Sequence, residues 1–143
     1  MYDDRSDMCG CMKPVKGIED VEEGLCEIQK GLKCLKAALE DLRCGDLCDA
    51  EKNLVKGISK IERGLCRLEK GLKCLSRSID CDDLDAIKDG ICDIKKGLKD
   101  ACCALKNLRC GRECEAEKDL VCAIQNIEDG LCKIMTGLKD VVN

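Results

Sequence analysis

The chain has 143 residues, of which 45% are hydrophobic and 38% charged, and its formal net charge is −4. This length and composition predict one soluble domain with a sizeable core. The acidic balance argues against nucleic acid as a partner, because phosphates require a basic surface. No apolar run is long enough for a membrane span. Histidine, the commonest metal ligand and proton shuttle, is absent.

Apolar residues recur three and four positions apart in four successive segments, a spacing that is typical of helices and fits no strand. Pro14 suits the first turn of the first helix, Asp46 and Asp80 can cap the next two, and glycines 45 and 111 stand where helices commonly end. The predicted helices cover residues 14–43, 46–76, 81–109 and 112–142. Residues 1–13 precede them as a flexible tail that contains two cysteines.

The chain is a tandem repeat. A shift of 66 residues aligns 63 positions of the two halves, and 28 of these are identical. A shorter motif, G-[LI]-C-x-[IL]-x-x-G-L-K, occurs twice in each half and begins at glycines 24, 64, 90 and 130. All the connections are short, so consecutive helices must run antiparallel. We therefore predict an all-α, up-down-up-down four-helix bundle over residues 14–143, built from two helical hairpins at 14–76 and 81–142.

Many of the thirteen glycines fall inside the predicted helices, where each costs about 1 kcal/mol relative to alanine. They are regularly placed. With Leu25 and its counterparts in the motif assigned to heptad position a, every g position of the four helices holds glycine or alanine, except Asp83 at the start of the third helix. Small residues at g allow two antiparallel backbones to approach closely. The glycines are therefore expected to be packing residues.

The same register predicts that the thiols point outward. No cysteine falls at a, d or g, and the motif cysteines Cys26, Cys66, Cys92 and Cys132 all fall at b, almost directly away from the core. We call these four the belt cysteines, because they are expected at one level around the middle of the bundle. The other cysteines are expected on its flanks, at its ends or in the tail: Cys9, Cys11, Cys34, Cys44, Cys48, Cys74, Cys81, Cys102, Cys103, Cys110, Cys114 and Cys122.

Thiols on every side and at both ends are poorly placed to form disulfides within one chain and well placed to form disulfides between chains. All sixteen cysteines are therefore candidates for intermolecular disulfides between copies of the chain. Such a protein would be a non-catalytic building block without a cofactor. Neither histidine, the usual base that partners a nucleophilic cysteine, nor a Cys-x-x-Cys motif is present.

Soft-metal binding is the alternative. Cys44, Cys48, Cys110 and Cys114 form two Cys-x3-Cys pairs at the same end of the predicted bundle, where four thiolates could bind zinc or copper(I). The chain also resembles the bacterial copper storage proteins, which are cysteine-rich four-helix bundles. That resemblance implies copper(I) storage, but those proteins direct their thiols into the core, where this sequence has aliphatic residues.

The repeated, histidine-free segments with GLCxIxKGLK and Arg-Cys-Gly, the latter at 43–45 and 109–111, resemble the cysteine-rich exosporium morphogenetic proteins of clostridial spores. The resemblance covers residues 15–142. It implies a structural protein of the outermost spore layer that assembles with itself, and with other spore-surface proteins, into a sheet locked by disulfides. It also implies synthesis in the mother cell, which agrees with an acidic start, Met1-Tyr2-Asp3-Asp4, that predicts no signal peptide.

Overall fold

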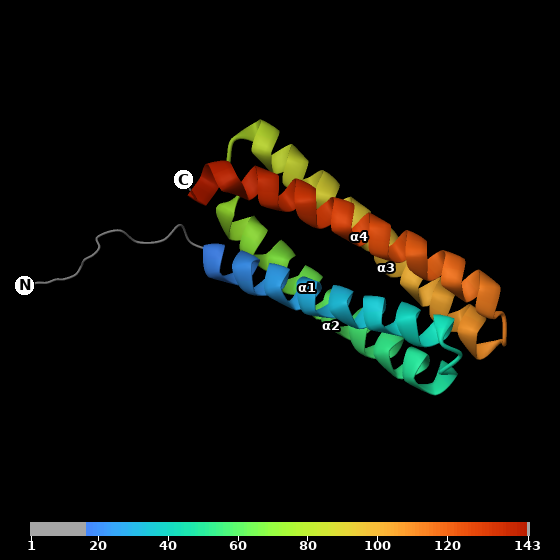
Figure 1. Cartoon of the computed structure of the whole chain (residues 1–143). Helices are drawn as coiled ribbons and strands as arrows, with labels where there is room; N and C mark the ends of the chain where they lie inside the picture. The colour runs from blue at the N-terminus through green and yellow to red at the C-terminus, as the bar shows by residue number, and fades with distance from the viewer. Residues whose placement is uncertain (1–16, 143) are drawn as a thin grey trace, which may run out of the picture.

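The structure is a computed structural model that describes residues 17–142, and side chains through residue 139. Its four helices form an antiparallel bundle of two hairpins, as predicted (Figure 1). The turn of each hairpin lies at one end of the bundle, and the α2–α3 connection lies at the other. The predicted tail, 1–13, is outside the described residues. The helices are α1 (Ile18–Arg43), α2 (Leu47–Leu75), α3 (Cys81–Arg109) and α4 (Glu113–Val142).

Local signals in the sequence determine most helix ends. The Asp46 carboxylate accepts a hydrogen bond from the Asp49 backbone N–H at 3.4 Å, and the Asp80 carboxylate accepts one from the Cys81 N–H at 3.1 Å. Gly45 and Gly111 follow α1 and α3 with φ of 81° and 79°, the left-handed conformation that ends many helices. These predicted caps and stops are confirmed.

The prediction that the first helix already includes Gly17 is wrong, because α1 begins at Ile18. Gly17 was expected inside a helix that begins near residue 14, but it has φ of 95° and stands before α1. A left-handed residue cannot continue a right-handed helix. Residues 14–16, including Pro14, lie outside the described part of the chain.

The core is entirely aliphatic. Isoleucine, leucine, valine and alanine side chains from all four helices form one buried cluster, and no polar or charged side chain of the described residues is buried. Ile28, Leu68, Ile94 and Ile134 are among the fully buried side chains. The residues that the sequence placed at a, d and g therefore do fill the interior, and no sulfur atom is among them.

Glycines bring the two helices of each hairpin into backbone contact. A Cβ atom added at Gly24 would lie 2.7 Å from the Gly64 carbonyl oxygen, and one at Gly31 would lie 2.8 Å from the Gly57 oxygen. The second hairpin repeats this contact between Gly90 and Gly130. Cβ atoms are essentially never found this close to another atom, so alanine would push the helices apart. The expected role of the g positions in close packing is confirmed.

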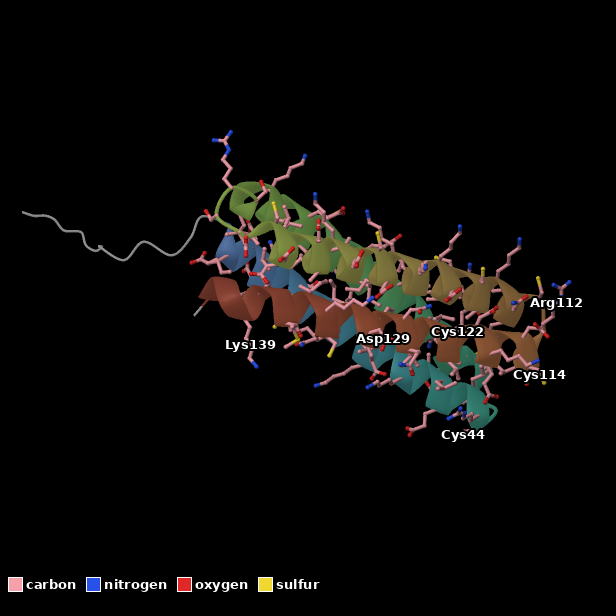
Figure 2. All side chains as sticks on the ribbon, turned by 90° about the horizontal axis from the view of Figure 1, so that it is seen from above. Cys44, Arg112, Cys114, Cys122, Asp129 and Lys139 are labelled. Carbon is pink, nitrogen blue, oxygen red and sulfur yellow. The ribbon has the colours of Figure 1, made fainter. Side chains whose placement is uncertain are left out.

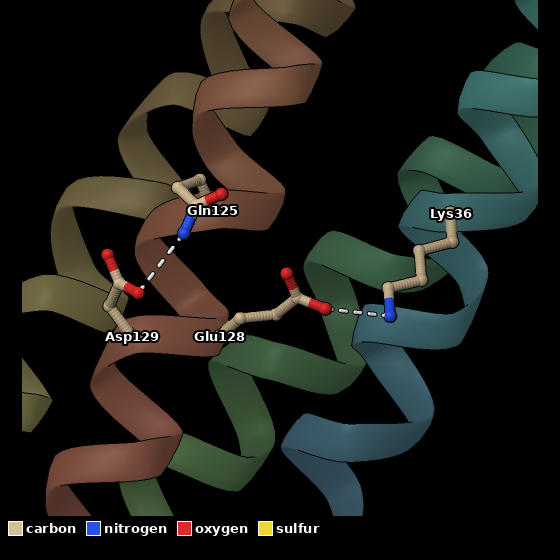
Figure 3. Close-up of polar contacts among 4 residues, drawn as sticks. All are labelled: Lys36, Gln125, Glu128 and Asp129. Atoms are coloured by element: carbon tan, nitrogen blue, oxygen red, sulfur yellow. Dashed lines mark hydrogen bonds and ion pairs between the residues drawn. The ribbon is translucent and has the colours of Figure 1, made fainter.

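Besides the shared aliphatic core, ion pairs between long side chains join the two hairpins. Lys36 Nζ lies 2.8 Å from Glu128 Oε2 where α1 passes α4 (Figure 3). Arg43 pairs with Glu117 at 2.9 Å, and the positions 66 residues away in each half repeat this pair as Arg109 with Glu51, also at 2.9 Å. The matching contacts show that the hairpins pack with approximate twofold symmetry. No described helix is long and apolar enough to cross a membrane.

The glycine contacts can be tested with Gly64→Ala. Alanine is the better helix former by about 1 kcal/mol, but its Cβ would lie 2.7 Å from the Gly24 oxygen and 3.0 Å from the Ile28 nitrogen. We expect the clash to dominate and to lower the free energy of unfolding by about 1–3 kcal/mol, measured by urea denaturation. Ser59→Ala, an exposed site on the same helix, is the control and should change it by less than about 0.5 kcal/mol. A more stable Gly64→Ala variant would contradict close packing.

Candidate functional site

The candidate site is the set of thiols on the surface. Of the fourteen cysteines in the described part of the chain, thirteen are exposed and Cys34 is half-buried. Free cysteine is normally among the most buried residue types, so this distribution is unusual. The predicted outward orientation is confirmed for the thirteen exposed thiols, whereas Cys34 is half-buried and Cys9 and Cys11 lie outside the described residues. The exposed thiols belong to Cys26, Cys44, Cys48, Cys66, Cys74, Cys81, Cys92, Cys102, Cys103, Cys110, Cys114, Cys122 and Cys132.

The belt cysteines leave the bundle near the points where its helices touch. Each lies two residues after a glycine of a backbone contact, that of Gly24 with Gly64 or that of Gly90 with Gly130. They open onto different faces. Cys66 lines a shallow groove on the first hairpin beside Glu27 and Arg63, whereas Cys92 lines a groove between α2 and α3. The structure therefore directs thiols of neighbouring helices to separate surfaces.

The thiols at the hairpin turns, which we call the tip cysteines, also face solvent: Cys44, Cys48, Cys110 and Cys114. Cys44 is the cap residue that directly follows α1, and Cys48 lies in the first turn of α2, so the left-handed Gly45 stands between them. Figure 2 shows Cys44 and Cys114 at the same end of the bundle, on different hairpins.

The tip cysteines do not converge as the metal alternative required. Within the described residues, no three or more cysteine, aspartate or glutamate side chains are grouped so that they could hold a metal ion. The physical reason is that each Cys-x3-Cys pair spans a chain reversal instead of one helix face, where residues four apart would be neighbours. What the arrangement can do chemically is expose many separate thiols to other molecules.

One thiol differs in its environment. Lys36 pairs with Glu128 between α1 and α4, and the equivalent residues between α3 and α2 are Cys102 and Glu62. Partial burial raises the pKa of the Cys102 thiol above its ordinary value, and the Glu62 carboxylate and the adjacent Cys103 raise it further. Cys102 therefore carries less of the reactive thiolate at a given pH.

The sequence analysis assigned no role to three exposed aliphatic side chains. Val55, Val121 and Met135 are the large hydrophobic residues that the described part of the chain exposes. The two valines are equivalent in the tandem repeat and fall outside the buried stripes of their helices. Both facts were visible in the sequence, although not the shape of the surface around them.

No protein-family model matches the chain, and no curated protein and no solved structure matches it either. Its function must therefore be inferred from its own residues.

Replacing the four belt cysteines by serine tests whether the fold depends on them. Their side chains are exposed, so we expect the helix content measured by circular dichroism to stay the same. The free energy of unfolding should change by less than about 0.5 kcal/mol per site. Ile28→Ala, a buried position two residues from Cys26, serves as the contrast and should cost about 2–5 kcal/mol. A large loss of helicity in the serine variant would show that the thiols are structural.

The raised pKa of Cys102 predicts its rate of alkylation. In mildly alkaline buffer, iodoacetamide should modify Cys102 more slowly than Cys103, and the gap should narrow as the pH passes the raised pKa and the thiolate forms. Glu62→Gln should speed modification at Cys102, because it removes a neighbouring negative charge. Glu128→Gln, its equivalent in the other half, should not. Rates follow from mass spectrometry of the peptides, and equal rates for Glu62→Gln and wild type would contradict the prediction.

Proposed function

We propose that this protein is a structural, non-catalytic building block that assembles with copies of itself and is locked by disulfides between surface thiols. The single observation that carries the proposal is the division between an aliphatic interior and exposed sulfur. An enzyme or a metal store gathers its reactive groups in one place, whereas these thiols are spread over the surface. The described thiols lie outside the buried core, so they are available for bonds to other molecules.

The linking reaction is thiol–disulfide exchange. A cysteine thiolate attacks a low-molecular-weight disulfide, such as oxidised glutathione, and one small thiol leaves. A thiolate of a second chain then attacks the mixed disulfide on the first, and the second small thiol leaves. Two protein thiols are oxidised to one disulfide, and one small disulfide is reduced to two thiols.

The proposed setting is the outer layer of a bacterial spore, the exosporium or outer coat. The resemblance of the repeated motifs to cysteine-rich exosporium proteins supports this setting, and so does a rod with thiols on several faces. In this setting the partners are further copies of the chain and other spore-surface proteins. Oxidation would follow exposure of the layer when the mother cell lyses.

Oxidation of the purified, reduced protein tests the proposal. With oxidised glutathione, we expect a ladder of multimers on non-reducing electrophoresis that collapses to monomer when reductant is added. The reason is that at least thirteen thiols per chain are exposed, and an exposed thiolate exchanges readily. A strictly monomeric product with its thiols oxidised would contradict cross-linking between chains.

Copper(I) titration of the reduced protein separates this function from thiol-based copper or zinc storage. A cross-linking protein is expected to bind copper(I) weakly and with little cooperation, because the described residues bring no three thiols or carboxylates together around one position. Tight binding of more than about four equivalents per chain, without polymer formation, would favour storage. Competition with a chelator of known affinity provides the measurement.

A further inference from the structure

Two hollows on the outside of the bundle are copies of each other. One lies on α2 and is lined by Cys48, Glu51, Lys52 and Val55. The other lies on α4, where Cys114, Glu117, Lys118 and Val121 occupy the equivalent positions, together with Cys122. We call these the α2 patch and the α4 patch. Their valines are 42% and 43% exposed, although a buried position would stabilise such a side chain.

The patches are identical in the two halves, although several other surface positions are not. Cysteine, glutamate, lysine and valine recur unchanged in the two halves at these four exposed or half-buried positions. Other surface positions changed type between the halves, such as Lys36 to Cys102, Arg63 to Asp129 and Lys56 to Cys122. Packing inside the chain does not require valine on an outer face, so the patches need another explanation.

Each patch has the layout of a helix seam that is complementary to itself. Cys48 and Val55 are seven residues apart and so lie on one line along α2, at ~100° per residue. Glu51 and Lys52, three and four residues after Cys48, lie on opposite sides of that line. When two such helices lie side by side in parallel about a twofold axis, the central residues meet their own copies. The glutamate flank of each then faces the lysine flank of the other.

The geometry points to a second copy of this chain as the occupant of each patch, an inference that rests on the proposed assembling function. The negative glutamate flank and the positive lysine flank make each patch complementary in charge to the same patch of a second chain. Arg109 already pairs with Glu51, and Arg43 with Glu117, but each glutamate side chain is still 41% exposed and can accept a second cation. Valine then packs on valine, and Cys48 or Cys114 of one copy lies beside Cys48 or Cys114 of the next.

Two patches make each copy divalent. Helix α2 packs against α1 and α3, and α4 packs against α3 and α1, so α2 and α4 occupy diagonal corners of the bundle. Their outer faces therefore point in opposite directions. A contact of this kind on both sides cannot close as a dimer and instead extends into a row of parallel rods. The turn ends of all the rods point the same way, and such rows are the elements of a layer.

A single valine and two ion pairs make a small contact, far below the roughly 1,000 Å² that a lasting interface buries. The patch is therefore a guide that selects which thiols meet, and the disulfide makes the contact permanent. Oxidised glutathione supplies the oxidising equivalents by the two-step exchange described above, with two glutathiones released for each Cys–Cys link.

The test uses full-length chains that keep only two cysteines, with all others replaced by serine. The chain with Cys48 and Cys114 should form a ladder of multimers with oxidised glutathione. The chain with Cys66 and Cys132 is the matched control, because these thiols are also exposed and lie on the same two helices. It should link at least about tenfold more slowly, because no patch guides it. Equal rates, or a faster control, would overturn the inference.

Variants with one linking cysteine or with both valines replaced test whether each chain has two contacts. A chain that keeps Cys48 alone should stop at a dimer. Val55→Asp with Val121→Asp in the Cys48/Cys114 chain should slow laddering at least about tenfold, because the facing carboxylates repel. Unchanged laddering would contradict the docking role of the valines. Circular dichroism verifies that each variant keeps its helices, and the exposed positions make this the expected result.

Disulfide mapping of the early dimers of wild-type protein tests the same contact without substitutions. Linked peptides should contain Cys48 or Cys114 from both chains. If wild-type protein forms ladders through other cysteines, the patch inference fails while the proposed function stands. If wild-type protein stays monomeric when oxidised, the proposed function fails. The two failures are therefore distinguishable.

Discussion

The contact on which the rest of this structure depends is the approach of two helix backbones at glycine. Carbonyl oxygens of Gly24 and Gly64 lie where any side chain on the facing residue would collide with them. Each helical glycine costs about 1 kcal/mol in helix propensity, and the dispersion contacts of the closer backbones offset that loss. The consequence is a narrow bundle whose interior is filled by aliphatic side chains, with none of the described cysteines among them.

The exposed thiols follow from this division. A sulfur atom that takes no part in packing can be oxidised, exchanged or bonded to another chain without disturbing the core, so the fold and the linking chemistry are independent. Cys102 is the exception, because partial burial and the nearby Glu62 carboxylate raise the pKa of its thiol, and we therefore expect it to react more slowly. Reactivity is therefore graded across the surface, even though the thiols have the same chemical identity.

The tandem repeat adds a second consequence. Because the hairpins pack with approximate twofold symmetry, any surface feature retained in both halves occurs twice and on different sides of the rod. In the assembly proposed above, duplication of the patch around Val55 as the patch around Val121 gives each chain two contacts, which is the difference between a dimer and a row. A structural layer needs this divalence, whereas a storage protein does not.

The sequence by itself determined the secondary structure, the register and the outward orientation of the described cysteines. These properties depend on neighbours within one helix or one hairpin, through the apolar period, the caps at Asp46 and Asp80 and the stops at Gly45 and Gly111. Only the tertiary structure decided that the four tip cysteines form no common metal-binding group, that Cys102 lies near Glu62 and that the valine patches lie on diagonal corners. Those properties depend on how one hairpin packs against the other, and the heptad pattern, which repeats identically along every helix, does not encode that packing.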